Sequence, residues 1–118
     1  EEKKALLKTL EDVQAMIGHM VGVAVESQEN PKEIYKVGLN TSRLLMATGD
    51  LIIAWLLLRQ ADIAQSKLAT AGKDTEFYNG KIASAKFFVR SVLPHISVER
   101  AVVESETGEI MNIAESAF

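Results

Sequence analysis

The chain has 118 residues, the length of one ordinary domain, and 47% of them are hydrophobic while 25% are charged, which excludes a disordered chain. The net charge of −3 argues against a nucleic-acid-binding protein, because such proteins usually carry a basic stripe. The absence of cysteine excludes disulfides, thiolate metal sites and a cysteine nucleophile, and it suits a reducing cytoplasm.

The first segment, EEKKALLKTL, begins directly in an amphipathic helix. Its apolar positions recur at spacings of four and three residues, which keeps them on one helix face. They are Leu6, Leu10, Val13, Ile17, Met20 and Ala24, and Met16 and Val23 widen the same face. This pattern predicts a helix from about residue 2 to about residue 27. Because the helix begins without a cap, an initiator Met or a signal segment, we interpret the chain as part of a longer protein.

The stretch SQENPKEIY predicts the start of a second helix near residue 31. Asn30 is suited to cap this helix, Pro31 to its first turn, and Glu33 to complete a capping box. The apolar pattern then continues to ATAGKD, where Gly72 is suited to end the helix. Residues 48–50, Thr-Gly-Asp, are a weak point at which a bend would divide this helix in two.

Residues 51–58, LIIAWLLL, are apolar on every side of the predicted helix. A membrane span needs roughly twenty apolar residues, and this run has eight. The sequence therefore favours a central helix covered by its neighbours, and no membrane span.

Asp74 is suited to cap a third helix, whose apolar residues again recur at spacings of four and three. They are Tyr78, Ile82, Ala85, Val89, Val92 and Ile96. Pro94 interrupts the hydrogen-bond ladder, so we expect a kink there and not a stop. The segment ESETGE predicts a turn, and IMNIAESAF predicts a short amphipathic C-terminal helix suited to pack on the rest.

These elements predict an all-α fold over residues 1–118 as a single domain. It is an up-and-down bundle of three long helices, or four if the second is broken, with a short C-terminal helix. No alternating pattern supports a sheet.

The sequence presents no catalytic, cofactor-binding or metal-binding set. Gly80-Lys81 does not match a phosphate loop, because the spacing to the preceding glycine is wrong and Ile82 stands where a hydroxyl is needed. Gly80 is better suited to the close approach of another helix. The two histidines, His19 and His95, lack the neighbours of known metal-binding helix motifs.

Asp50 is the candidate buried polar residue, because apolar helix flanks it on both sides. A buried carboxylate must be paired or protonated, so it is either an acid with a shifted pKa or, as we favour, a structural cap or ion pair.

The aromatic residues are predicted to pack the bundle, because aromatic residues at helical spacing usually belong to a core. They are Trp55, Phe77, Tyr78, Phe87 and Phe88. Phe87 and Phe88 point about 100° apart on a helix. We expect Phe88 to enter the core and Phe87 to contact either the C-terminal tail or a preceding domain.

Residues 49–68, GDLIIAWLLLRQADIAQSKL, and 74–94, DTEFYNGKIASAKFFVRSVLP, resemble the C-terminal extension domain of a subgroup of acyl-CoA dehydrogenases. The matching positions are Gly49, Trp55, Asp74, Phe77, Tyr78, Lys81, Ala85, Phe87, Phe88, Leu93 and Pro94. The closing IMNIAESAF also resembles the end of that family. The resemblance extends over roughly the whole chain and is weakest before Asn30.

The resemblance implies a full-length flavoenzyme that removes hydrogens from the α and β carbons of an acyl-CoA thioester, with FAD taking the hydride and a glutamate acting as base. It also implies that the base, the FAD contacts and the acyl-CoA channel lie upstream, so no cofactor is assigned to this chain. Its expected partners are the upstream dehydrogenase core and another subunit, in the cytoplasm. The alternatives are a free-standing helical interaction module and an independent ligand-binding bundle.

Overall fold

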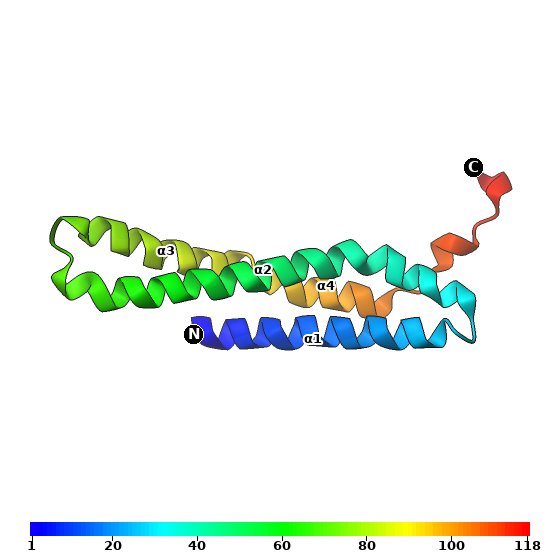
Figure 1. The fold of residues 1–118 in the computed structure, drawn as a ribbon. Coiled ribbons are helices and arrows are strands. Elements are labelled where there is room, and N and C mark those ends of the chain that lie inside the picture. Colours follow the sequence, from blue (N-terminus) through cyan, green and yellow to red (C-terminus); the bar gives the residue numbers. More distant parts are fainter.

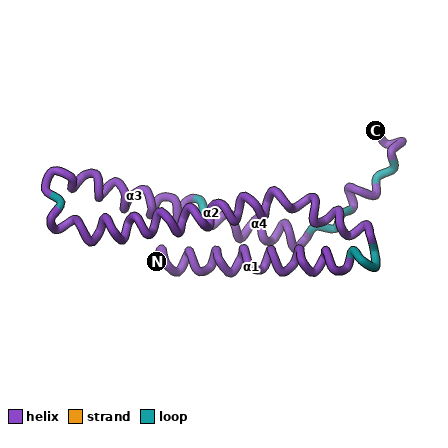
Figure 2. The backbone as a smooth tube through the Cα atoms, viewed as in Figure 1, coloured by secondary structure: helices purple, strands orange, loops and turns teal.

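The computed structural model describes residues 1–118 and contains four α-helices joined by short turns (Figure 1). The α-helices are α1 (Glu2–Glu26), α2 (Ile34–Lys67), α3 (Thr75–Ser91) and α4 (Pro94–Ser105). Short 3-10 turns are formed by Pro31–Glu33, Leu68–Thr70, Gly72–Asp74, Glu109–Asn112 and Glu115–Ala117. The backbone contains no strand (Figure 2), so the prediction of an all-α bundle is confirmed.

The molecule is long and thin. Its principal extents are 68 × 30 × 17 Å, and its Cα radius of gyration is 19.7 Å, where a compact domain of this length has about 13–14 Å. Helices α2 and α3 form an antiparallel hairpin at one end, and α1, α2 and α4 pack together at the other (Figure 1). A body this thin buries few side chains.

The core lies where the four helices meet. It comprises Val13, Met16, Met20, Ala47, Ala54, Val89, Leu93, Ile96 and Val103. The apolar face predicted for the third helix is confirmed, with Ala85 and Val89 of α3 and Ile96 of α4 buried. On α1 the predicted apolar face is buried at Val13, Met16, Met20 and Val23, whereas Leu10 and Ile17, at its edge, are exposed.

Helix α2 is continuous through Gly49, so the expected break is absent. The chain ends this helix through a 3-10 turn, and Gly72 follows with a φ of +53°. This left-handed conformation favours glycine, as expected for a helix terminator. The prediction that neighbours cover residues 51–58 on every side is wrong, because only Ala54 is buried and Ile52, Ile53, Trp55 and Leu56 are exposed.

The predicted side-chain caps do not form. Asn30 precedes the turn into α2, but its amide Nδ2 donates a hydrogen bond to Glu33 Oε1 at 3.2 Å, and its side chain does not cap the backbone. The carboxylate of Glu33 accepts this bond and pairs with Lys36, but the backbone N–H of Asn30 donates to Glu26 and not to Glu33. Asp74 occupies the N-cap position of α3 without a capping hydrogen bond. The predicted positions were correct and the predicted bonds were not.

Pro94 divides the predicted third helix. Val92 and Leu93 form a turn, and Pro94 is the first residue of α4, where its missing N–H removes no helical hydrogen bond. Helix α4 continues in nearly the direction of α3 (Figure 1). The bundle therefore has four helices because the third predicted helix is broken, not the second.

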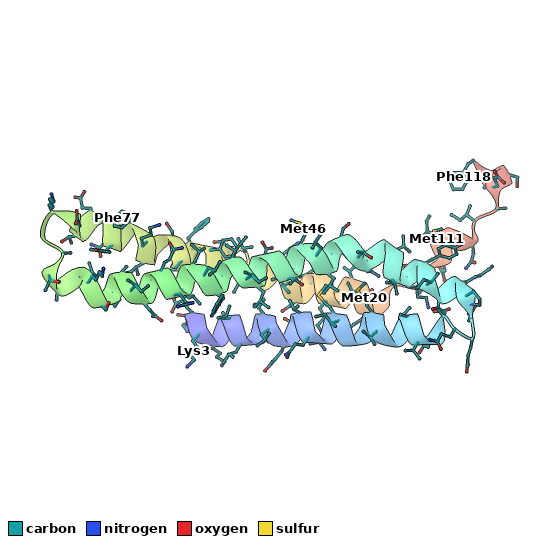
Figure 3. The ribbon with its side chains drawn as sticks, viewed as in Figure 1. Lys3, Met20, Met46, Phe77, Met111 and Phe118 are labelled. Carbon is teal, nitrogen blue, oxygen red and sulfur yellow. The ribbon has the colours of Figure 1, made fainter.

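The C-terminal segment forms two 3-10 turns that project from the end of the bundle, and the predicted helix packed on the bundle is absent (Figure 3). Phe118 is 94% exposed. Gly108 begins the segment with a φ of +73°, and a Cβ there would lie 3.3 Å from Lys36 Cγ, so this position requires glycine.

The segment Pro31–Thr70, which contains α2, is long and apolar enough to cross a membrane by length and composition. Core helices of soluble proteins can meet the same criterion. In this structure α2 packs along α1, α3 and α4.

Candidate functional site

The five aromatic residues singled out in the sequence do not gather in one pocket. Trp55 is 47% exposed, and the Arg59 guanidinium carbon lies 5.2 Å from its ring centroid. Phe77 and Tyr78 form an edge-to-face pair with centroids 5.5 Å apart near the far end of the α2–α3 hairpin. The expectation that Trp55 and Phe77 are core residues is not met within this domain.

Phe87 and Phe88 point to different surroundings, as predicted. Phe88 is half-buried and packs against the core, whereas Phe87 is 69% exposed. A hollow of about 480 Å³ lies beside Phe87, between Leu57 of α2 and Ser84 of α3. The tail is not the partner of Phe87, because it projects beyond α4, at the end of the molecule away from α3 (Figure 1).

Lys81 lies within α3, so Gly80-Lys81 is helical and forms no phosphate loop. The ammonium group of Lys81 donates a hydrogen bond to Gln60 Oε1 at 3.2 Å and lies 5.5 Å from the Phe77 ring centroid. Lys81 thus ties α3 to α2. A Cβ at Gly80 would meet nothing within 4 Å, so the expected close approach of another helix is absent in this structure.

Asp50 is half-buried on α2, and its carboxylate makes neither an ion pair nor a hydrogen bond in this structure. The expected buried pairing of Asp50 is therefore absent from the isolated domain. The buried carboxylate of this fold is Asp12 instead, at 1% exposure.

Asp12 joins α1 to α4 through a cluster of polar contacts. Lys8 Nζ lies 2.5 Å from its Oδ1, one turn earlier on α1. From α4, Ser97 Oγ donates to Oδ2 at 2.6 Å, and Arg100 Nη1 donates to Oδ1 at 3.0 Å. Arg100 also pairs with Glu104 through Nε at 2.8 Å. The sequence signal that could have found this site is Lys8 four residues before Asp12, beside buried Val13.

Burial is the largest single influence on the pKa of Asp12 and acts to raise it. The hydrogen bonds from Lys8, Ser97 and Arg100 act together in the opposite direction and prevail, so the pKa lies below its ordinary value. Asp12 is therefore ionised at neutral pH, which suits a structural ion pair and not an acid that gives up protons.

A second carboxylate, Glu99, joins α4 to α2. Arg43 Nη1 of α2 lies 2.5 Å from Glu99 Oε2, and His95 Nε2 lies 2.8 Å from Oε1. The hydrogen bond from Arg43 is the main cause that lowers the pKa of Glu99, against a raising effect of burial. His95 thus contacts Glu99 one turn further along the same helix, α4.

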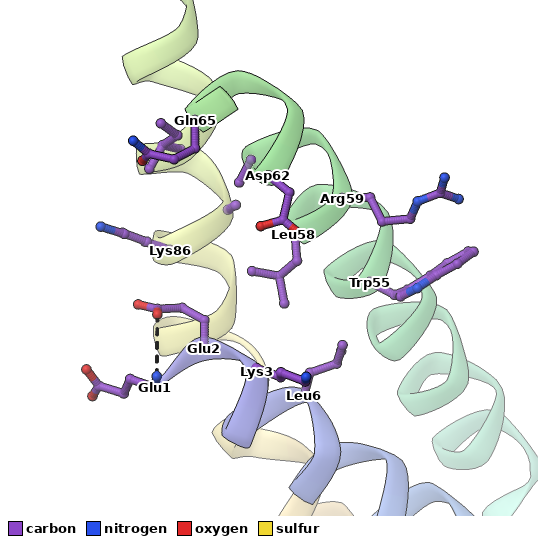
Figure 4. Close-up of a pocket in the computed structure, with 13 residues that line it drawn as sticks. Glu1, Glu2, Lys3, Leu6, Trp55, Leu58, Arg59, Asp62, Gln65 and Lys86 are labelled. Atoms are coloured by element: carbon purple, nitrogen blue, oxygen red, sulfur yellow. Dashed lines mark ion pairs between the residues drawn. The ribbon is translucent and has the colours of Figure 1, made fainter. Parts of the chain in front are cut away.

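A hollow of about 500 Å³ lies where α1 begins against α2 and α3 (Figure 4). Leu58 of α2 extends toward the start of α1 (Figure 4), and Leu6 of α1, Trp55 and Ile82 also line the hollow. Its charged residues are of both signs: Glu1, Glu2, Lys3, Arg59, Asp62 and Lys86. This mixture selects no particular charge on a ligand.

Two carboxylates, one buried and one half-buried, connect helices of this domain. No group of three or more histidine, aspartate or glutamate side chains is placed to hold a metal ion. The 3-10 turns that lead into α2 and α3 read Pro-Lys-Glu and Gly-Lys-Asp, and neither offers the glycine-rich backbone that cradles phosphates. Asp12 and Glu99 are engaged in contacts between helices.

Comparison with known proteins identifies the family. The model of a family described as "Acetyl-CoA dehydrogenase C-terminal like" matches residues 1–114, nearly the whole chain. The chain therefore belongs to this family of acyl-CoA dehydrogenase C-terminal domains, which confirms the resemblance found in the sequence.

Three curated relatives place this domain within longer proteins. The broad-specificity linear acyl-CoA dehydrogenase FadE5 of Mycobacterium tuberculosis is 42% identical over 99% of this chain and 20% of its own length. A butyryl-CoA dehydrogenase of Syntrophomonas wolfei is 38% identical over 70% of this chain and 14% of its own. A 3-methylmercaptopropionyl-CoA dehydrogenase of Ruegeria pomeroyi is 40% identical over 55% of this chain and 11% of its own length. The chain spans about a fifth of the first relative, in its C-terminal part.

Proposed function

We propose that the chain is the non-catalytic C-terminal helical domain of a cytoplasmic, FAD-dependent acyl-CoA dehydrogenase. The full-length protein removes hydrogens from the α and β carbons of acyl-CoA thioesters, with FAD as the hydride acceptor. The observation that supports this is the family match over residues 1–114 together with a 42% identical relative that is about five times longer.

The residues of this domain do not fit FAD. Its hollows are lined by charges of both signs or by a few apolar side chains, and no glycine-rich turn leads into a helix. We therefore assign the FAD contacts, the catalytic base and the acyl-CoA channel to the upstream part. This domain's own role is to pack against that part or against another subunit, without a membrane span and without nucleic acid.

The test compares two purified proteins. The full-length protein is expected to show flavin absorbance and to reduce an electron-accepting dye when given acyl-CoA thioesters. The 118-residue chain is expected to be colourless and inactive in the same assay. A colourless, inactive full-length protein would overturn the assignment to the enzyme, and flavin bound by the 118-residue chain would overturn the non-catalytic role.

The alternative is a free-standing helical interaction module. The exposed apolar side chains of α2 favour a binding role of some kind. The reading frame decides between the two: a dehydrogenase core encoded upstream of Glu1 supports the proposal, and a start codon immediately before Glu1 supports the alternative.

A further inference from the structure

The surface of α2 that turns away from the core is apolar and continues onto α3. Six side chains on it each expose between 44% and 69% of their surface. They are Leu45, Met46, Ile52, Ile53 and Leu56 of α2 and Phe87 of α3, and we call this set the α2–α3 face. Met46 visibly points away from the other helices (Figure 3). Soluble proteins rarely leave so many large apolar side chains together in water without a partner.

One charge lies on this surface. Between Arg43 and Arg59, Asp50 is the only charged residue of α2. It lies one helical turn from Met46 and from Ile53, at the edge of the α2–α3 face. Its carboxylate is half-buried and has no partner in this domain. A carboxylate within an apolar docking surface needs a cation or hydrogen-bond donors from the other side.

The start of the chain lies at the same stretch of α2 and α3, on the side where α1 packs. Glu1 and Glu2 pair with Arg90 of α3, and both line the hollow beside Trp55 and Leu58 of α2. Leu56 and Leu57 lie between these two residues in the sequence, and successive residues of a helix point about 100° apart, so the α2–α3 face lies on another side of the same stretch of the hairpin. A polypeptide that precedes Glu1 is joined to the domain beside this stretch of α2 and α3, and this covalent connection gives it a high effective concentration around the hairpin, including its outer side.

We propose that the α2–α3 face is the surface on which this domain docks onto the dehydrogenase part that precedes it in the same polypeptide, and that a basic side chain of that part pairs with Asp50. This inference rests on the proposed function. The relative that matches 99% of this chain carries about four-fifths of its length outside the match, which is the chain available to cover the face. The docking buries Phe87 and gives Asp50 the partner that it lacks here.

The first experiment places a photo-reactive benzoylphenylalanine at position 87 of the full-length protein, with the same substitution at Val21, an exposed residue of α1, as the control. The probe at position 87 is expected to cross-link to peptides upstream of Glu1 within one polypeptide, at least about tenfold more than the probe at position 21. Any of four outcomes would overturn the proposal. They are cross-links between two copies of residues 1–118, cross-links to lipid when phosphatidylglycerol vesicles are added, equal cross-linking from both positions, and no cross-linking.

The second experiment measures hydrogen–deuterium exchange in the full-length Asp50→Lys variant, with Asp62→Lys as the matched control at an exposed position of the same helix. A lysine at position 50 would be repelled by the proposed cation, so the backbone amides of residues 44–58 are expected to exchange about tenfold faster in Asp50→Lys. Asp62→Lys is expected to leave this exchange unchanged. Asp50→Glu is expected to retain most of the protection. Unchanged exchange in Asp50→Lys would overturn the pairing. So would equally accelerated exchange in the core of α1 around Met16, because it would assign Asp50 to the fold itself.

The measurements on the full-length protein distinguish an error in the proposed function from an error in the docking surface. If the full-length protein has no flavin absorbance and no acyl-CoA-dependent dye reduction, the proposed function is wrong. If it has both and position 87 does not cross-link upstream, only the docking surface is wrong.

Discussion

At the scale of single residues, Asp12 holds two helices together. Its two carboxylate oxygens accept hydrogen bonds from Lys8 of α1 and from Ser97 and Arg100 of α4, and its side chain is almost wholly buried. A buried carboxylate in this position is stable only because several donors satisfy both oxygens. Asp50, in contrast, is half-buried and has no partner within the domain.

We expect Asp12→Ala to lower the free energy of unfolding of the 118-residue chain by about 2–3 kcal/mol at pH 7, because hydrogen bonds to a charged group are lost. Asp50→Ala is the matched control and should change it by less than about 0.5 kcal/mol, since no contact is removed. Urea denaturation followed by circular dichroism measures both. Equal losses would show that the polar cluster around Asp12 does not stabilise the fold.

The lowered pKa of Asp12 also predicts the effect of acid. In the unfolded chain its pKa is about 3.9, so as the pH falls below about 4 the unfolded chain binds a proton before the folded protein does. The stability from Asp12 is therefore complete above about pH 5 and is lost as the pH falls toward the lower folded-state pKa. The difference in urea midpoint between the wild type and Asp12→Asn should shrink between pH 5 and pH 3. A constant difference would contradict the lowered pKa.

At the scale of elements, α3 has two unequal faces. Ala85 and Val89 are buried, Phe88 packs beside them against the core, and Phe87 lies outside. The same helix carries Gly80 at an open position, where a side chain would meet nothing. The segment after α4 is different, because Gly108 adopts a left-handed conformation against Lys36.

Phe88→Ala should destabilise the 118-residue chain by about 3 kcal/mol, because it empties space beside the core. Phe87→Ala should cost less than about 0.5 kcal/mol in the same chain, because its ring is exposed. Denaturation midpoints of the two variants decide this. A larger loss for Phe87→Ala would mean that the faces of α3 are wrongly assigned.

Two glycine substitutions should act in opposite directions. Gly80→Ala is expected to raise the free energy of unfolding by about 0.5–1 kcal/mol, because alanine favours the helix and finds open space. Gly108→Ala is expected to lower it by about 1–2 kcal/mol, because alanine resists the left-handed conformation. Thermal unfolding of both variants provides the comparison, and a stabilising Gly108→Ala would contradict the turn described here.

At the scale of the whole molecule, a thin arrangement of helices leaves much apolar surface outside. The α2–α3 hairpin extends beyond α1, so no third helix covers its far half (Figure 1). Few side chains are buried as a result, and the large apolar residues of α2 are mostly exposed. This shape is typical of a domain that completes its packing against another body.

Small-angle X-ray scattering of the 118-residue chain should give a radius of gyration close to 19.7 Å if the extended arrangement persists in solution. A collapsed domain would give about 13–14 Å. The measurement is made over a concentration series, so that self-association through exposed apolar residues is recognised by a rise with concentration. A value near 14 Å at all concentrations would contradict the fold.

The sequence by itself determined the helices, because spacings of three and four residues report a helix face without knowledge of its neighbours. It also determined the adjacent but different roles of Phe87 and Phe88, since 3.6 residues per turn separates their directions. The family was recognisable from motifs such as A-x-FF and LP, which are local. Each of these features is carried by residues that lie close together in the sequence.

Only the tertiary structure decided which carboxylate is buried. Asp50 has the more apolar sequence neighbours, yet Asp12 is buried because Ser97 and Arg100 come from 85 and 88 residues away. The same holds for residues 51–58, whose exposure follows from the thin shape and not from their composition. Burial depends on which elements meet in space, and the periodicity of one helix identifies an apolar face without identifying what covers it.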